Sequence, residues 1–497
     1  MLEKLKKESN LTYTENGAVT FRSTESHCLD FFAMSGGMRN AADDRILNLF
    51  VPAYIEDPDT AVKLMFFARD IRGGMGERRL FRICLRWLAL HHADSVVKNI
   101  EYISEFGRFD DLLTLLGTPC EKAAVSVIDK QLHDDIDDME KNNPISLLGK
   151  WLPSINASDK QTRVNALVIA RKLNMSNAVY RKTLSQLRRY LKILENNLRE
   201  RDYSFDYSEI PSKAMLKYRK AYLRNDKERY VEYLNKVEKG EVKMNTSTLA
   251  PYEIIHPIVV NCSGFFNVKV ETMEIDTIKA LDTLWNAQED FTDNTNSLVV
   301  VDGSGSMYGS MKGEPMPIEV ALSLGIYFAE RNNGEFHNHF ITFSESPRLV
   351  EIKGENIVEK TEYCMSFNEM ANTNISAVFD LILKTAVKNG IPKENMPSII
   401  YIVSDMEFDY CAKDASMTNF EYAKKIFEEH GYKLPQVVFW NVRSRHDNVP
   451  VKSNEQGVIL VSGCSPRIFA MVKDKNYDPY SFMQEVLSSD RYKNITA

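Results

Sequence analysis

The stretch that decides the fold is SLVVVDGSGSMYGS, residues 297–310. Its apolar run from Leu298 to Val301 predicts a strand covered on both faces, as in a parallel α/β sheet. The strand ends at Asp302, and two glycines then let the chain turn while Asp302, Ser304 and Ser306 present oxygens toward one point. One carboxylate with neutral hydroxyls suits a hard cation such as Mg²⁺, which would need further oxygens from other loops.

Two downstream segments can supply those oxygens. In SIIYIVSDMEFD, a second apolar strand ends on Ser404 and Asp405 and so repeats the pattern of a buried strand with a carboxylate at its tip. In ANTNISAVFD, Thr373 and Asn374 precede a helical pattern, as an N-cap region should. We therefore expect three loops to contribute to one site.

The combined residues resemble a known metal site. The set Asp302, Ser304, Ser306, Thr373 and Asp405 is similar to the metal-ion-dependent adhesion site of von Willebrand factor A domains. The resemblance implies that the serines and the threonine contact or position the ion, that the aspartates bind it directly or through water, and that a partner's carboxylate supplies the last ligand. Mg²⁺ is the expected ion, with Ca²⁺ or Mn²⁺ as alternatives. The other interpretation is a Gly/Ser loop that only caps a helix.

Strands and helices alternate after a polar linker at 286–296. The expected strands are SLVVV, HFITFS, SIIYIVS, QVVFWNV and GVILVSG, and helical patterns lie near 317–331, 375–388, 418–430 and 479–489. This order makes βαβ units and hence a largely parallel, Rossmann-like sheet with helices on both faces. Residues 296–497 are therefore expected to form a von Willebrand factor A domain that carries the metal site.

Residues 1–290 are predicted to be helical after a short hairpin. The hairpin is expected because Asn16-Gly17 lies between β-forming residues. TAVKLMFFARDI, RRLFRICLRWLALHH and EYISEFGRFDDLLTLL then form helical patterns with glycines between them, compatible with a HEAT-like stack of helix pairs in a ring or solenoid. The clearest single helix is capped by Ser176 or Asn177 and extends through MSNAVYRKTLSQLRRYLKILENNLRE, whose apolar positions step by four and three.

Charge is segregated along the chain. The net charge is −7, yet residues 150–243 contain 22 basic and 11 acidic side chains. Such a surface can bind phosphates because their neutralisation releases counterions, and Tyr218, Tyr222 and Tyr230 could stack on unpaired bases. The candidates for RNA binding are Arg181, Arg188, Arg189, Lys192, Lys217, Arg219, Lys220 and Arg224. The alternative is a solvated helix face with the tyrosines in the core.

The order of these parts resembles the Ro ribonucleoprotein family, and most closely its bacterial and phage relatives. The likeness rests on GAVTFRSTESHCLDFFAMSGG, RDIRGGMGERRLFR and FGRFDDLL, followed by the basic segment and the A-type domain. It implies a TROVE-type module in residues 1–290. In that family, helical repeats form a ring whose hole admits single-stranded ends of misfolded RNAs, its basic outer face binds small non-coding RNAs, and the A domain joins the ends of the ring.

The sequence argues against several other classes. It has no Gly-x-x-x-x-Gly-Lys-Ser/Thr loop, and HNH at 337–339 has no further ligand set. No apolar run approaches the ~18 residues of a membrane span, and the first residues do not form a secretory signal. Because the seven cysteines are also scattered, we expect a cytoplasmic protein with reduced thiols.

Two functions from different classes remain open. The first is a non-catalytic RNA-binding protein of the Ro type, which binds small non-coding or misfolded RNA on a basic helical surface while a divalent-metal A domain closes the ring. The second is a metal-dependent protein-interaction scaffold with no RNA ligand, in which the ion at Asp302 captures an acidic side chain of a partner. A metal-dependent nuclease is a third hypothesis that the residues do not favour.

Overall fold

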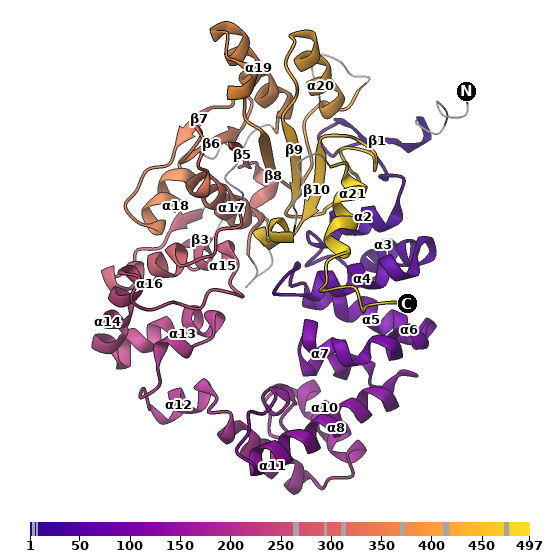
Figure 1. Ribbon diagram of the computed structural model, residues 1–497, viewed down its shortest axis with the longest axis vertical. Coiled ribbons are helices and arrows are strands. Elements are labelled where there is room, and N and C mark those ends of the chain that lie inside the picture. Colours follow the sequence, from indigo (N-terminus) through magenta and orange to yellow (C-terminus); the bar gives the residue numbers. More distant parts are fainter. Residues whose placement is uncertain are drawn as a thin grey trace.

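Helices make up most of the chain, and a six-stranded sheet lies toward its C-terminus (Figure 1). The computed structural model describes residues 1, 5, 8–261, 268–292, 296–309, 315–367, 373–410, 417–471 and 477–497. None of the helices in these ranges combines the length and the hydropathy that a membrane span requires.

The sheet is built from the apolar runs that the sequence predicts as strands. Its order is β10-β9-β8-β5-β6-β7, and all neighbouring pairs are parallel except β6 and β7. The strands are β5 (Ser297–Asp302), β6 (His339–Phe343), β7 (Leu349–Glu351), β8 (Ile399–Ser404), β9 (Gln436–Asn441) and β10 (Val458–Ser462). β5 and β8 are buried along their whole length, which explains their continuous apolar character. The prediction of an α/β unit is confirmed, and the antiparallel edge strand β7 was not predicted.

Helices cover both faces of this sheet. They are α17 (Pro317–Arg331), α18 (Ile357–Met365), α19 (Ile375–Asn389), α20 (Asn419–Glu429) and α21 (Pro479–Leu487), with short 3₁₀ turns η4 (Gly305–Tyr308), η5 (Lys393–Asn395) and η6 (Pro466–Met471). Successive side chains of a strand point to opposite faces. Val299 and Val301 accordingly belong to the core under α17, whereas Leu298 and Val300 belong to the core under α19 and α20.

The N-terminal half begins with the predicted hairpin and continues as a series of helices. β1 (Leu11–Tyr13) and β2 (Val19–Phe21) pair antiparallel. The helices are α2 (His27–Ser35), α3 (Asp43–Glu56), α4 (Pro58–Arg69), α5 (Arg78–His91), α6 (Ala93–Asn99), η1 (Ile100–Tyr102), α7 (Ile103–Phe106), η2 (Phe109–Leu115), α8 (Glu121–Glu140), α9 (Leu148–Trp151), α10 (Lys160–Lys172) and α11 (Asn177–Tyr190). The third helical pattern, 101–116, is therefore divided into short pieces around Gly107.

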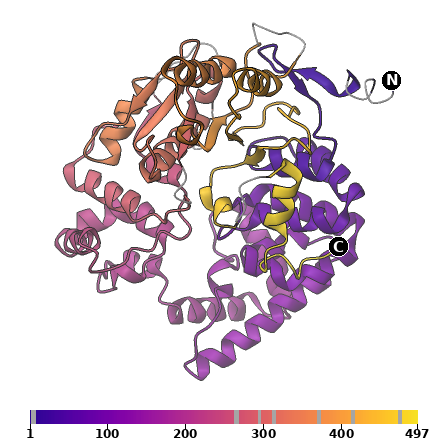
Figure 2. The same ribbon diagram turned by 45° about the horizontal axis from the view of Figure 1, so that its top comes forward.

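A second helical arc leads back to the sheet. It comprises α12 (Leu194–Glu200), η3 (Tyr207–Glu209), α13 (Ser212–Asn225), α14 (Lys227–Glu238), α15 (Pro251–Ile255), β3 (Val259–Asn261), β4 (Val268–Val270) and α16 (Ile275–Asn286). α12 connects the two arcs, and no residue of this helix is buried. In both ribbon views the arcs and the α/β unit together trace a ring (Figures 1 and 2).

The predicted helix from 176 to 200 is broken into α11 and α12. Ser176 caps α11 as expected, since its side chain accepts a hydrogen bond from the Val179 amide. The helix ends because Lys192 adopts a left-handed conformation, with φ of 45°. The carbonyl of Arg188 then has no helical donor, and the side-chain amide of Asn196 donates to it at 3.4 Å. A side chain thus replaces the backbone partner that a continuous helix would supply.

The first arc is fastened to the sheet through α2 and the C-terminal segment. The hydroxyl of Ser462 on β10 donates to the carbonyl of Phe32 at 2.9 Å and accepts from the amide of Gly36 at 3.0 Å. A Cβ atom on Gly36 would lie 2.5 Å from the amide nitrogen of Gly463, so only glycine allows this approach. Further along, the hydroxyl of Tyr492 donates to the fully buried carboxylate of Asp70 at 3.0 Å.

The second arc is fastened to α17, which packs on the same face of the sheet as α21. His256, directly after α15, lies 2.7 Å from the buried carboxylate of Glu319. The indole of Trp285 on α16 donates to Glu330 at 2.7 Å. The α/β unit therefore contacts both ends of the helical arcs, and the ring is closed by side-chain contacts as well as by the chain.

Candidate functional site

The carboxyl edge of the sheet gathers the predicted acidic and hydroxyl residues. The backbone amide of Ser304 donates to Asp302 Oδ1 at 2.9 Å, and the Ser404 hydroxyl donates to Asp302 Oδ2 at 2.6 Å. The hydroxyls of Ser304 and Ser306 lie 3.1 Å apart. β5 and β8 are adjacent and parallel, which places Asp302 and Asp405 at neighbouring strand ends. The first loop and the β8 loop are thus brought together as expected.

Two buried carboxylates share this edge. The side chains of Asp302 and Asp405 are 0% and 1% exposed. Burial, followed by the repulsion of Asp405, raises the pKa of Asp302 to about 7 despite its hydrogen bonds from Ser404 and Ser304. A bound cation would reduce both the cost of burying the charge and the repulsion between the two carboxylates, because it would compensate the charge that water no longer solvates. The donor set of carboxylate and hydroxyl oxygens therefore fits a hard divalent ion.

Thr373 lies beside the β8 loop, and its hydroxyl already has partners. It donates toward the carbonyl of Glu407 at 2.9 Å and the carboxylate of Asp409 at 3.0 Å, and it accepts from the side-chain amide of Asn16 at 3.1 Å. Asn16 is the tip of the N-terminal hairpin. The structure thus joins Thr373 to the hairpin and the β8 loop, and among the described residues its hydroxyl forms no hydrogen bond with the Asp302 loop.

Several residues at this edge were missed by sequence reasoning. Arg445 donates to Asp405 at 3.0 Å and pairs with Glu15 at 2.5 Å, while Arg443 donates to the carbonyls of Ser306 and Gly309. Both arginines follow the end of β9. The loops that follow parallel strands lie at one edge of the sheet, and this rule could have identified both arginines. The sequence after β9, however, does not repeat the Asp-x-Ser-x-Ser pattern that indicated the site.

A further acidic group at this edge is internally satisfied. Ligand atoms of Glu15, Glu407 and His446 lie within 4.8 Å of one another. The two oxygens of Glu407 accept hydrogen bonds from the Glu15 amide and from Asn448, and the Glu15 carboxylate pairs with Arg445. These interactions fasten the hairpin to the sheet without requiring an ion.

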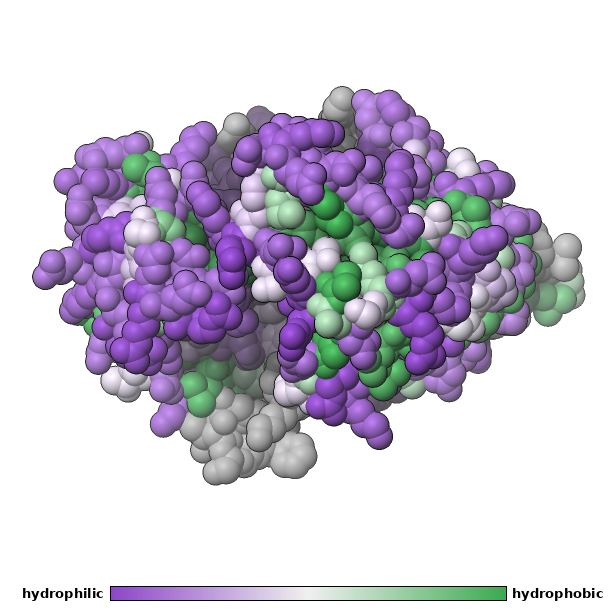
Figure 3. Space-filling model, turned by 90° about the horizontal axis from the view of Figure 1, so that it is seen from below, coloured by the Kyte–Doolittle hydropathy of each residue, from purple (hydrophilic) through white to green (hydrophobic). Residues whose placement is uncertain are grey.

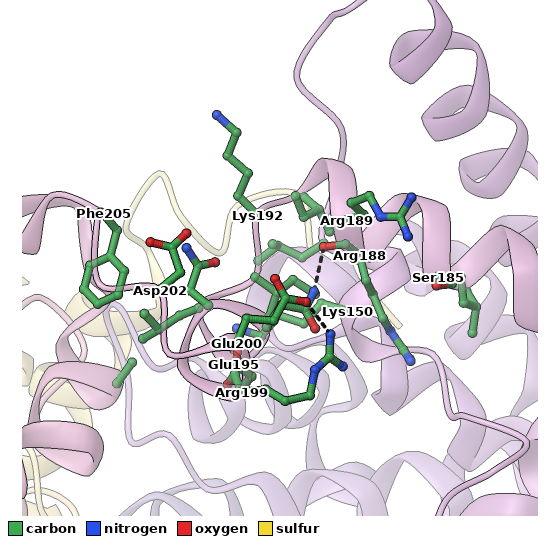
Figure 4. Close-up of a pocket in the computed structure, with 18 of the residues that line it drawn as sticks. Lys150, Ser185, Arg188, Arg189, Lys192, Glu195, Arg199, Glu200, Asp202 and Phe205 are labelled. Carbon is green, nitrogen blue, oxygen red and sulfur yellow. Dashed lines mark hydrogen bonds and ion pairs between the residues drawn. The ribbon is translucent and has the colours of Figure 1, made fainter. Parts of the chain in front are cut away.

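The predicted basic segment lines a large pocket between α9, α11 and α12. The pocket has a volume of about 1130 Å³ and is lined by residues that include Lys150, Arg181, Arg188, Arg189 and Lys192. Figure 4 shows Arg188 and Arg189 on the side of α11, Asp202 and Phe205 on the opposite side, and Glu195 and Glu200 between them.

Seen from below, hydrophilic side chains cover most of the surface of the molecule, and apolar side chains gather mainly in one area (Figure 3).

The eight RNA-binding candidates divide into accessible and internal residues. Arg181, Arg189, Lys192, Lys217, Lys220 and Arg224 are exposed. Arg188 is half-buried and donates to the carbonyls of Gly149 and Leu152 and to the Ser154 hydroxyl. Arg219 is only 7% exposed and donates to the Leu216 carbonyl, and burial lowers the pKa of both side chains. Both arginines therefore stabilise the helical layer, and Arg188, unlike Arg219, also lines the pocket.

Basic side chains in residues 150–243 do not form one continuous track. Glu195, Glu200, Asp202, Asp206 and Glu209 line the same pocket as the cations of α11. On α13 and α14, several cations are paired with acids: Lys213 with Glu253, Lys227 with Asp276, Arg229 with Asp226 and Lys236 with Glu232. Among the described residues, exposed cations without an ion pair thus lie on α10 (Lys160, Arg163 and Arg171), on α11 and on one face of α13.

Two of the three predicted stacking tyrosines belong to the core. Tyr222 and Tyr230 are fully buried and their rings lie 5.2 Å apart within an aromatic cluster that includes Tyr207. Tyr218 is partly exposed, with the ammonium group of Lys217 4.8 Å from its ring centre. The alternative interpretation of these tyrosines as core residues is correct for Tyr222 and Tyr230.

Comparison with known proteins identifies two family models. The model described as a domain of unknown function, DUF2828, matches residues 14–134 and 123–290, and a second domain of unknown function, DUF7788, matches residues 296–489. Uncharacterized protein L728 of Acanthamoeba polyphaga mimivirus is 29% identical, over 96% of this chain and 87% of its own length. The crystal structure of the RO (RSR) protein of Deinococcus radiodurans is similar with a TM-score of 0.36 and 11% identity, over 94% of this chain and 99% of that protein.

Proposed function

The chain belongs to the DUF2828 family, and we propose that it is a non-catalytic RNA-binding protein of the Ro type with a divalent-metal A domain. The proposed ligand is RNA with single-stranded segments, such as small non-coding or misfolded RNA. The observation that carries the proposal is the group of cations on α11 and just after it that line the pocket and form no ion pair among the described residues.

Three side chains make this group of cations suited to phosphates. Arg181, Arg189 and Lys192 are exposed, line the pocket and form no ion pair with any acid in the part of the chain that the structure describes. A row of cations binds a phosphate chain through counterion release, independent of base sequence. The acids of α12 and of the segment after it line the same pocket and disfavour a second strand, so the geometry favours a single strand along α11.

The test is a comparison of two triple charge reversals in the full-length chain. We expect Arg181→Glu, Arg189→Glu and Lys192→Glu together to weaken binding of a single-stranded oligoribonucleotide by on the order of tenfold or more at 0.1 M salt, since three phosphate contacts become repulsions. The matched control is Lys217→Glu, Lys220→Glu and Arg224→Glu on α13, which changes the charge equally. Fluorescence anisotropy measures both. Equal affinity of the α11 variant and the wild type would refute the assignment to the pocket.

The carboxyl edge of the sheet supports a second role for the same protein. Asp302, Ser304, Ser306 and Asp405 would hold a divalent ion, most favourably Mg²⁺, and the ion would supply a Lewis-acidic contact for a carboxylate. The chain's own residues orient this edge: Ser404 fixes the Asp302 carboxylate, and Arg445 fixes Asp405. We propose that this edge captures an acidic side chain of a protein partner. A pull-down that is lost in Asp302→Ala while RNA binding persists would separate the two roles.

A further inference from the structure

A second cationic cleft lies far from the pocket, along α5. It has a volume of about 530 Å³ and is lined by residues of α3 and α5 and by Thr114 of η2. Four of the lining residues are arginines, namely Arg78, Arg79, Arg82 and Arg86, and only one, Asp43, is acidic. The cleft therefore has a strong positive surplus that the basic segment 150–243 does not contribute to.

The arginines form a row on one face of the helix. Arg78, Arg82 and Arg86 recur every four residues, which places them one above the other along α5. Arg82 pairs with Asp110 and Asp111, and Arg86 donates to the carbonyls of Thr114 and Leu116. Arg78 is exposed and, within the described ranges, forms no ion pair. The row thus contains two guanidinium groups without a carboxylate partner.

Positive charge is concentrated around Arg78 at the start of α5. Arg78 and Arg79 occupy the first turn of α5, where the positive end of the helix dipole repels cations. No side chain caps this end of the helix. Arg108 and Arg82 lie near enough to Arg78 that, after burial, their repulsion is the next cause that lowers its pKa. Asp43 is paired with Arg79, and Asp110 and Asp111 partly offset the repulsion at Arg78, so an anionic ligand would offset the repulsion that remains at Arg78.

The other wall of the cleft is apolar and aromatic. Leu47, Ile83, Trp87 and Leu90 line it, and Leu90 is 49% exposed. The Trp87 ring is held by edge contacts with Phe50 and Tyr54, each with ring centres 5.8 Å apart. A fixed indole beside a row of guanidinium groups can stack a planar base while the arginines bind its phosphate.

We propose that this cleft binds one nucleoside phosphate, with the phosphate on the arginine row of α5 and the base against Trp87 and Leu90. The volume lies in the range of pockets that enclose small ligands. Arginine is the residue that binds phosphate in a bidentate manner, and an indole matches a base better than an aliphatic side chain. The nucleotide is either free or one residue of an RNA strand, and both sources present the same chemistry.

Photo-crosslinking of the full-length chain with 4-thiouridine monophosphate tests the site. We expect labelling of the tryptic peptide 87–98, competition by UMP at concentrations where inorganic phosphate competes weakly, and at least tenfold less labelling in Arg78→Glu and in Leu90→Glu. Both positions are exposed, so neither variant removes a core contact. Lys220→Glu, an exposed cation on α13, is the matched control and should label like the wild type.

The outcomes distinguish the sources and the competing ligand. If a 4-thiouridine decamer labels the peptide and the monomer does not, the cleft binds one residue of an RNA strand. If the monomer also labels the peptide, the cleft binds a free nucleotide. Labelling that is unchanged in Arg78→Glu, or displaced by an acidic leucine-containing peptide as readily as by UMP, would overturn the proposal. The same assay in the Arg181, Arg189 and Lys192 charge-reversal variant separates this site from the α11 pocket, because the peptide 87–98 should still be labelled there.

Discussion

The carboxylate of Asp302 lies in the protein interior beside a second carboxylate, that of Asp405. Each is fixed from a different direction: Ser404 and the Ser304 amide donate to Asp302, and Arg445 donates to Asp405. Among the residues that the structure describes, a neighbouring cation neutralises Asp405 and none pairs with Asp302. Asp302 is therefore the residue whose charge an added cation would stabilise most.

Replacing Asp302 by asparagine tests this charge balance. Asp302→Asn removes a buried charge next to a like charge. We therefore expect the free energy of unfolding of the metal-free variant to equal that of the wild type or to exceed it by up to about 1 kcal/mol. The stabilisation of the wild type by millimolar Mg²⁺ should be absent in the variant. Thermal unfolding with and without Mg²⁺ measures both effects, and an equal Mg²⁺ response in the two proteins would contradict the site.

At the scale of elements, α12 differs from the other helices because it has no buried residue and left-handed residues at both ends. Lys192 precedes it with φ of 45°, and Arg201 follows it with φ of 57°. The sequence pattern of 176–200 did not reveal this break, because the spacing of four and three continues through it. Side-chain periodicity reports which face is apolar, and it does not report backbone conformation.

The C-terminal cap of α12 provides a stability prediction. A left-handed residue after a helix is usually glycine, because a Cβ atom is unfavourable there. We expect Arg201→Gly to raise the free energy of unfolding by up to about 1 kcal/mol, whereas Arg199→Gly, inside the same helix, should lower it by about 1 kcal/mol. Urea unfolding of the two variants should therefore give shifts of opposite sign. A loss of stability in Arg201→Gly would contradict the left-handed cap.

The contact between α15 and α17 provides a prediction on pH. The hydrogen bond that His256 donates to Glu319 raises the pKa of His256, and Glu253 adds to the effect, while burial raises the pKa of Glu319. Protonated His256 stabilises the fold fully when the pH is below the pKa of this histidine in the unfolded protein. The stabilisation is lost as the pH rises through the higher pKa that His256 has in the folded protein. The wild type should accordingly lose more stability than His256→Gln between pH 6 and pH 8. Parallel urea titrations at the two pH values measure this, and identical losses would refute the coupling.

At the scale of the whole molecule, the ring arises from contacts that no local pattern encodes. The five apolar strands of the sheet, the hairpin, helices such as α4, α5 and α17, and the placement of Asp302, Ser304 and Asp405 at one sheet edge could be predicted, since each depends on a short apolar run or a motif. The hydrogen bonds of Tyr492 with Asp70 and of Asn16 with Thr373 each join positions more than 350 residues apart in the sequence. Such pairs, like the burial of Arg219 and the acids facing α11, depend on the packing of whole elements and leave no periodic signal.

The salt dependence of RNA binding tests the central claim most directly. If Arg181, Arg189 and Lys192 each contact a phosphate of a single strand, the logarithm of the association constant should fall with the logarithm of salt concentration with a slope of about −2. In the triple charge-reversal variant of α11 the slope should approach zero, while the α13 control keeps the slope of the wild type. A wild-type chain that binds no RNA at low salt, or an α11 variant with an unchanged slope, would contradict the account.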